Sequence, residues 1–167
     1  LSDLSADIDA GKVTTILSVG EDLTAAGLSA EQLAKVTLVY LGSHANATSA
    51  AAKVIIPTLT VFEKSGSFIN QQFRLQKFAS TIPGLAGAAD DRVVLDQLLA
   101  DVGGASAGSD LPSVWAELSA QIPAFANKAY ANIPATGLLL DSSNWSGLDF
   151  PEGESLHFKP AAAEATA

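Results

Sequence analysis

Three short runs of β-branched and aliphatic residues, each ending near a glycine or proline, most constrain how this chain can fold. They span Val13 to Val19, Thr37 to Leu41 and Val54 to Ile56. Strands that are apolar at nearly every position are typical of a parallel sheet that is buried on both faces. Segments with helical patterns separate the runs, and about a dozen residues are close to the minimum for joining parallel strands. The sequence therefore predicts an α/β fold, with a parallel sheet covered by helices.

Apolar spacing and capping residues predict short helices between these strands. Residues 1–9 repeat leucine and isoleucine at near-helical spacing, and Gly11 follows where a helix would end. Ser29 and Gln32 fit a capping box, which predicts a helix that runs to about Lys35. A further short helix is expected over Thr48 to Lys53.

Two longer amphipathic helices are predicted in the second half of the chain. Asp90 or Asp91 caps the first, and Gly103-Gly104 ends it. Its apolar residues form two adjacent rows, which are Val94, Leu98 and Val102, and Leu95 and Leu99. Asp110 opens the second, and Pro123 ends it. The apolar stripe of the second consists of Leu111, Val114, Trp115, Leu118 and Ile122.

The domain organisation follows from these elements. Residues 57–78 leave the pattern of the sheet and hold two short extended pieces, Ser67 to Asn70 and Phe73 to Phe78, and a linker rich in proline, glycine and alanine covers 82–89. We predict an α/β domain over 1–104 and a helical extension with an irregular tail over 105–167. The tail would dock through aromatic anchors, Trp145, Phe150 and Phe158.

The charge and the residue inventory exclude several functions. The formal net charge is -9 and the nine basic residues are scattered, so neither nucleic acid nor anionic lipid is expected as a direct ligand. No apolar run approaches the roughly 20 residues of a membrane span. Without cysteine, these residues cannot bind zinc or an iron–sulfur cluster through thiolates. Leu1 in first place and the absence of methionine predict a fragment, and the acidic start, unlike a signal peptide, leaves the cytoplasm as the default compartment.

Two loops that follow predicted strands hold polar side chains at the edge where open α/β sheets bind ligands. Gly20-Glu21-Asp22 follows the first strand, and Gly42 to Asn46, which includes His44, follows the second. Neither loop has the glycine spacing of a phosphate-binding motif, so each is either a ligand contact or an ordinary strand-to-helix turn. His44 is either a site residue or a side chain that braces its loop, and a metal there would need a second ligand besides the distant His157.

Charged and aromatic residues elsewhere leave two interpretations open. Glu63, Lys64 and Arg74 lie among apolar residues of the 57–78 segment. They form either a structural ion-pair cluster or an anion contact, since the arginine guanidinium suits bidentate binding of anions. Trp115 and Phe125 are expected either in the core or at a contact with a neighbouring protein chain.

Several motifs occur together, and in order, around the third strand. Residues 52–57 read Ala-Lys-Val-Ile-Ile-Pro, residues 63–70 read Glu-Lys-Ser-Gly-Ser-Phe-Ile-Asn, and Arg-Leu-Gln stands at 74–76. Together they resemble the molybdopterin oxidoreductase signature, which reads A-D-V-V-L-P, E-K-x-G-T-F-x-N and G-R-x-Q. Residues 11–22 resemble the family's Gly-Lys strand that ends in Gly-Glu-Asn. With the helix over 90–103, the resemblance covers about residues 1–104 and implies a Rossmann-like half of that fold.

Within this superfamily, the chain is most similar to the carboxyl-terminal part of the large G-type component of the NADH-quinone oxidoreductases (complex one). That part keeps the molybdopterin-enzyme fold and is generally regarded as a relic without bound molybdenum. Departures from the signature favour the relic, because Phe73 replaces the glycine of G-R-x-Q, Gln72 the preceding glutamate and Ser67 the threonine. A side chain at position 73 would crowd a bound pterin or nucleotide.

The resemblance implies a structural domain that scaffolds a respiratory electron-transfer complex, with no catalytic residue, metal site or cofactor of its own. Iron–sulfur clusters would lie elsewhere in the parent subunit. The partners would be other domains of that subunit and other subunits of the complex, which would hold the protein at the inner membrane without inserting it. The alternative is the cofactor-binding portion of an active molybdenum or tungsten enzyme such as a formate dehydrogenase. Molybdopterin guanine dinucleotide would then contact Gly20, Glu21, Asp22, Asn70 and Arg74.

Overall fold

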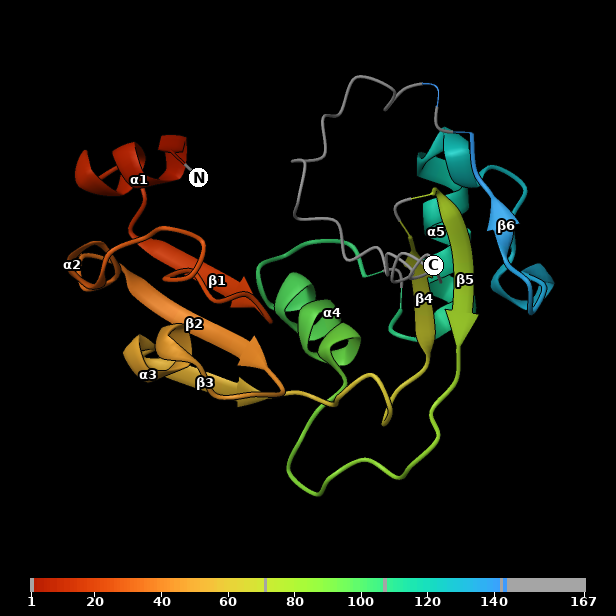
Figure 1. Cartoon of the computed structure of the whole chain (residues 1–167), viewed down its shortest axis with the longest axis horizontal. Coiled ribbons are helices and arrows are strands. Elements are labelled where there is room, and N and C mark those ends of the chain that lie inside the picture. The colour runs from red at the N-terminus through yellow and green to blue at the C-terminus, as the bar shows by residue number, and fades with distance from the viewer. Residues whose placement is uncertain (1, 71, 107, 142, 144–167) are drawn as a thin grey trace, which may run out of the picture.

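The computed structural model describes residues 2–70, 72–106, 108–141 and 143. Two three-stranded sheets organise them, a parallel sheet in the order β1-β2-β3 and an antiparallel sheet in the order β4-β5-β6 (Figure 1). The predicted fold class, α/β with helices flanking a parallel sheet, is confirmed. The predicted tail anchors Trp145, Phe150 and Phe158, and also His157, lie outside the described residues.

The parallel sheet consists of β1 (Thr15–Val19), β2 (Thr37–Gly42) and β3 (Val54–Pro57). Its register aligns Leu17 with Val39 and Val39 with Val54. β3 continues through Pro57, one residue beyond the predicted end. An edge strand tolerates proline because one side of its backbone needs no hydrogen-bond partner within the sheet.

Three short helices accompany this sheet, which are α1 (Ser2–Asp9), α2 (Ala30–Leu33) and α3 (Ala47–Ala51). The predicted capping box is confirmed, because the Gln32 amide donates to Ser29 Oγ at 3.2 Å and the Ser29 amide donates to Gln32 Oε1 at 3.1 Å. α2 ends before the predicted Lys35. α3 begins one residue earlier than predicted, since Asn46 provides the N-cap.

One face of the parallel sheet carries a well-packed core. Ile8 from α1 and Leu33 from α2 pack with Leu38 of β2, and all three are almost fully buried. Ile16 of β1 lies at the edge of the same cluster. Burying a leucine or isoleucine side chain contributes roughly 1.5–3 kcal/mol, so this cluster fixes both helices on the sheet.

The second half of the chain builds its own core around the antiparallel sheet. Its strands are β4 (Gly66–Ile69), β5 (Arg74–Phe78) and β6 (Leu138–Leu139), and its helices are α5 (Leu111–Gln121), η1 (Pro123–Phe125) and η2 (Tyr130–Asn132). Leu75, Trp115 and Ile133 are buried together there. The Phe125 ring meets Trp115 edge-on at 5.3 Å, which confirms the core interpretation of this aromatic pair.

The segment over 57–78 thus shares a core with residues 111–140, and β5 pairs with β6 across the predicted division at residue 104. That division itself stays a prediction. α4 (Asp91–Asp101) has the predicted N-cap, Asp90, but none of its residues is buried. No helix in the described ranges has the length and hydropathy that a bilayer span requires.

Candidate ligand-binding edge of the parallel sheet

The three parallel strands end at a common edge, and polar side chains follow each of them. Asp22 follows β1, Ser43 and His44 follow β2, and Thr60 follows β3. Ligands of open α/β sheets bind outside the carboxyl ends of the strands. This edge is therefore the expected position of a ligand site.

Asp22 and Thr48 form a hydrogen-bonded pair behind the β1 loop. Asp22 Oδ1 accepts from the Thr24 hydroxyl at 2.7 Å and from the Thr48 hydroxyl at 3.0 Å. Thr48, which is fully buried, accepts in turn from the Leu23 amide at 2.7 Å. The hydrogen bond from Thr24 is the main cause that lowers the pKa of Asp22. This carboxylate is ionised at neutral pH and ties α3 to the β1 loop.

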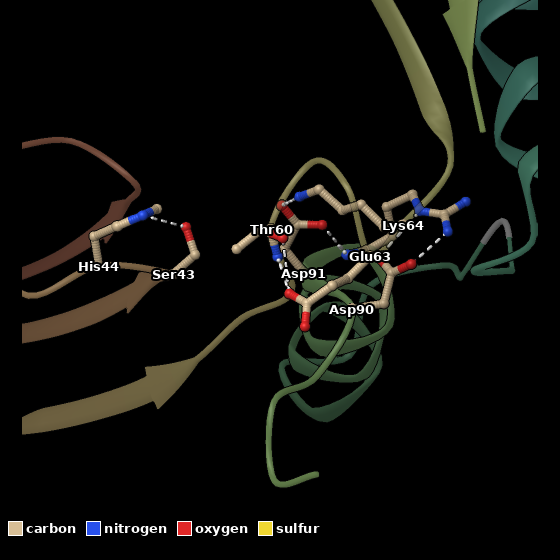
Figure 2. A network of polar contacts seen from close by, with 8 residues as sticks. Ser43, His44, Thr60, Glu63, Lys64, Asp90 and Asp91 are labelled. Carbon is tan, nitrogen blue, oxygen red and sulfur yellow. Dashed lines mark hydrogen bonds and ion pairs between the residues drawn. The ribbon is translucent and has the colours of Figure 1, made fainter. Parts of the chain in front are cut away.

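Ser43 and His44 form an exposed pair after β2. Ser43 Oγ lies 2.9 Å from His44 Nδ1, and the Tyr40 hydroxyl donates to the backbone oxygen of His44 at 3.1 Å. Asn46 Nδ2 donates to the same Tyr40 hydroxyl. Figure 2 shows the Ser43–His44 pair well apart from the carboxylates of Glu63 and Asp91. These contacts favour the loop-bracing interpretation of His44.

A second polar network links the loop after β3 to the start of α4 (Figure 2). Glu63 Oε2 accepts from both the amide and the hydroxyl of Thr60 at 2.8 Å, and its Oε1 accepts from the Leu85 amide at 2.8 Å. The backbone hydrogen bond from Thr60 is the main cause that lowers the pKa of Glu63. The Lys64 ammonium pairs with Asp91 at 2.6 Å.

Arg92 and Asp90 form the adjacent, half-buried ion pair. Burial opposes ionisation of Asp90, but the hydrogen bonds from Arg92 outweigh it and lower the pKa of Asp90. The same hydrogen bond to Asp90 raises the pKa of Arg92. Arg92 Nη1 is buried and has no acceptor among the described groups. Such a donor is costly when left unsatisfied, so an acceptor at Nη1 would stabilise the pair.

A cavity of about 250 Å³ adjoins this network, and its lining includes the charged residues Lys64, Asp91 and Arg92 and the aromatic residues Phe68 and Phe78. The two phenylalanine rings stack at 4.8 Å between centroids. Asp90 and Asp91 neutralise the two cations at its wall. The cavity has an aromatic wall and a balanced charge, and it does not have the excess positive charge that would favour phosphate.

The predicted cofactor contacts fall into two separate groups. Gly20, Glu21 and Asp22 lie at the end of β1, whereas Asn70 and Arg74 lie at the turn of the β4–β5 hairpin (Figure 1). Asn70 Oδ1 accepts from the Arg74 amide at 2.9 Å, so this side chain closes the hairpin turn.

The ion-pair cluster of Glu63, Lys64 and Arg74, one of the two interpretations from sequence, is wrong. The Arg74 guanidinium donates to the Thr136 carbonyl at 3.2 Å, because β5 pairs with β6 and faces that loop. Lys64 pairs instead with Asp91. Sequence reasoning missed Asp91 and Thr48 as structural partners, although Asp91 was visible as an acidic residue in the first turn of a predicted helix.

Phe73 has an unusual backbone for an aromatic residue. Its φ angle is 58°, in the left-handed region that glycine adopts without strain. The side chain is half-buried against the core around Leu75 and Trp115. Its carbonyl oxygen accepts from the Leu140 amide at 2.9 Å. The packing and the hydrogen bond together hold the strained turn.

Comparison with known proteins gives one similarity to report. No family model matches the chain. The protein described as "Putative formate dehydrogenase YrhE" of Bacillus subtilis (strain 168) is 24% identical over 128 residues, which make up 74% of this chain. The match covers only 13% of that protein, so the chain spans a small part of its relative's length. The similarity supports the molybdopterin-oxidoreductase resemblance of the sequence motifs and does not single out the NADH-quinone oxidoreductases.

Proposed function

We propose that this chain is a structural domain of a protein that resembles the large G-type component of NADH-quinone oxidoreductases, and that it scaffolds an electron-transfer complex. The likeness to a formate dehydrogenase supports the broader oxidoreductase resemblance. The departures from the family signature at Ser67, Gln72 and Phe73 favour the narrower one. Other domains of the parent subunit and other subunits of a respiratory complex would be its partners, at the inner membrane but not inserted into it.

Phe73 is the observation that carries this proposal. It stands where the family signature has glycine, and its φ of 58° is a conformation that suits glycine. The turn therefore has a backbone that suits glycine, while its aromatic side chain packs against the core around Leu75 and Trp115. This combination favours a scaffold that descends from a cofactor-binding loop.

The positions and hydrogen bonds of the five predicted contact residues argue against a shared dinucleotide site. Asp22 Oδ1 and Asn70 Oδ1 already accept hydrogen bonds from their own loops. The end of β1 and the β4–β5 turn lie in different sheets. Molybdopterin therefore has no part in the proposed function, and we expect any iron–sulfur clusters of the parent protein to be bound by residues outside this chain.

A second candidate function is the cofactor-binding part of an active molybdenum or tungsten enzyme. The name of the similar Bacillus subtilis protein favours it. Under this alternative, the same five residues would meet the guanine dinucleotide only after the two loops rearrange. Metal content separates the two candidates.

The first experiment is elemental analysis of the full-length parent protein, purified without oxygen. The scaffold proposal expects iron and neither molybdenum nor tungsten. Stoichiometric molybdenum or tungsten would overturn the scaffold proposal and would favour the alternative, in which the loops at Asp22 and Arg74 contact the cofactor.

A second experiment uses Phe73→Gly, with Phe73→Asn as the matched control. Both residues tolerate a left-handed backbone, but only glycine removes the whole side chain. If the turn descends from a nucleotide-binding loop, Phe73→Gly gains binding of GDP, measured by calorimetry, while Phe73→Asn and the original chain bind none. A folded Phe73→Gly variant without GDP binding would contradict that origin.

A further inference from the structure

An apolar groove runs between the parallel sheet and α4. We call it the sheet–α4 groove. It has a volume of about 580 Å³. Its lining is entirely aliphatic and consists of Leu17, Val39, Val54, Ile56, Leu95, Leu98, Leu99 and Val102. Four of these side chains come from the three strands, three come from α4, and Val102 is the C-cap of α4, so the groove lies between two apolar surfaces.

The groove leaves aliphatic side chains exposed on both of its walls. Leu17 and Val54 of the sheet are 44% and 46% exposed, and Val102 at the end of α4 is 81% exposed. Strands of a parallel sheet are normally covered on both faces. A contiguous apolar surface of this kind marks an interaction site more often than a free surface.

The charge next to the groove indicates what kind of partner fits. With 3.6 residues per turn, Asp96 and Asp101 flank the apolar row of α4 on its two sides. The last turn of α4 contains no basic residue, and Arg92 in the first turn is paired with Asp90. A cationic partner is therefore complementary to α4, whereas a second copy of the chain would bring aspartates against aspartates.

We propose that the sheet–α4 groove binds an amphipathic α-helix of a partner protein. The helix would insert an aliphatic stripe between the sheet and α4 and place Lys or Arg beside Asp96 and Asp101. Helix-in-groove recognition of this type uses apolar anchors at i, i+3, i+4 and i+7. This inference names the kind of partner that the proposed scaffold would bind, but its evidence comes from the groove alone. The metal content of the parent protein tests the scaffold role separately.

The test measures binding of synthetic helical peptides to the 167-residue chain by fluorescence anisotropy. The probe is a labelled amphipathic Leu/Lys peptide of about 18 residues, since isolated helices shorter than ~12–15 residues are marginal. Two matched peptides serve as controls, one with the same composition in scrambled order and one with glutamate in place of lysine. We expect the Leu/Lys helix to bind at least tenfold more tightly than either control.

Variants locate the binding site on the chain. Val102→Asp and Leu98→Asp place a carboxylate in the groove and should weaken binding about tenfold or more, or about 1.4 kcal/mol. Val93→Asp is the matched control, because Val93 is 50% exposed and lies on the opposite side of α4. The double variant Asp96→Lys/Asp101→Lys should reverse the preference between the lysine and glutamate peptides.

Several results would overturn the proposal. Equal binding of the scrambled peptide would indicate charge attraction alone, and equal loss in Val93→Asp and Val102→Asp would place the contact elsewhere. A dimer in sedimentation experiments that Val102→Asp dissociates would identify a second copy as the occupant. Val102-dependent binding to phosphatidylcholine vesicles would identify a lipid surface. Absence of binding by every peptide would overturn the proposal outright.

Discussion

The two faces of the parallel sheet differ sharply in how they are covered. On one face, which we call the closed face, Ile8, Leu33 and Leu38 pack together and are at most 2% exposed. On the other face, which we call the open face, Leu17 and Val54 approach α4 without being covered by it, and α4 buries none of its residues. Both faces have the apolar pattern of a buried surface. The pattern indicates that a surface needs cover, but it does not indicate which element provides it.

The largest expected effect separates these two faces directly. Leu38→Ala removes a side chain from the closed core and should lower the free energy of unfolding by about 2–5 kcal/mol, because a cavity remains. Leu98→Ala on the open face should cost well under half as much, since Leu98 is already 37% exposed. Urea denaturation of both variants measures the difference. Equal losses would mean that α4 is packed as tightly as α1 and α2.

A buried hydroxyl gives the next effect. Thr48→Val keeps the shape of the side chain but removes the acceptor for the Leu23 amide and the donor to Asp22. We expect a loss of about 1–3 kcal/mol, because a buried donor stays unsatisfied. The matched control is Thr37→Val, at an exposed strand position, which should change little. A neutral Thr48→Val would show that the link between the β1 loop and α3 adds no stability.

The helix α2, which packs on the closed face of the parallel sheet, begins with a capping box. Ser29→Ala removes the acceptor for the Gln32 amide and should cost about 1 kcal/mol. Ser29→Asp keeps a capping acceptor and should restore most of that stability. Thermal unfolding of the two variants tests this prediction. Equal losses in both variants would indicate that packing of Leu33 alone holds α2.

Acid tests the polar links around the loop after β3 and the start of α4. The folded-state pKa values of Glu63 and Asp90 are lowered by their hydrogen bonds, so their ionised forms stabilise the fold. That contribution is complete above their unfolded pKa values of about 4 and is lost as the pH falls through the lower folded values. The urea concentration at the midpoint of unfolding should therefore decrease once the pH drops below about 4. This decrease should be smaller in the Glu63→Gln variant. A midpoint that rises on acidification would contradict these shifts.

The local elements of the fold could be predicted from sequence, and the long-range pairings could not. Ser29, Asp90 and Asp110 indicate where their helices begin because a cap acts within three residues. The pairing of Leu75 with Leu138 depends on the whole intervening path, and no local pattern encodes it. The exposure of α4 could not be predicted for the same reason. Helical periodicity identifies the apolar side of a helix, but it does not indicate whether another element packs against that side.

The candidate site shows the same limit. The loops at Asp22 and His44 were predicted at the carboxyl edge of the sheet, where the structure places them. The partner of Lys64 was not, because Asp91 lies 27 residues away and the charge pattern offers several acids. The role of Thr48 was also missed, since a threonine near a helix start has no distinctive signal before the neighbouring strand is placed.

The register of the two sheets has a consequence for the order of folding. β1 and β2 pair residues that are 22 positions apart, whereas β5 and β6 pair residues that are 63 to 65 positions apart. Closing a longer loop costs more chain entropy and slows the contact. During synthesis, all residues of the parallel sheet have been made by residue 57, long before those of β6. If a partner helix binds the open face of that sheet as proposed, its association can begin while the second half of the chain is still being made.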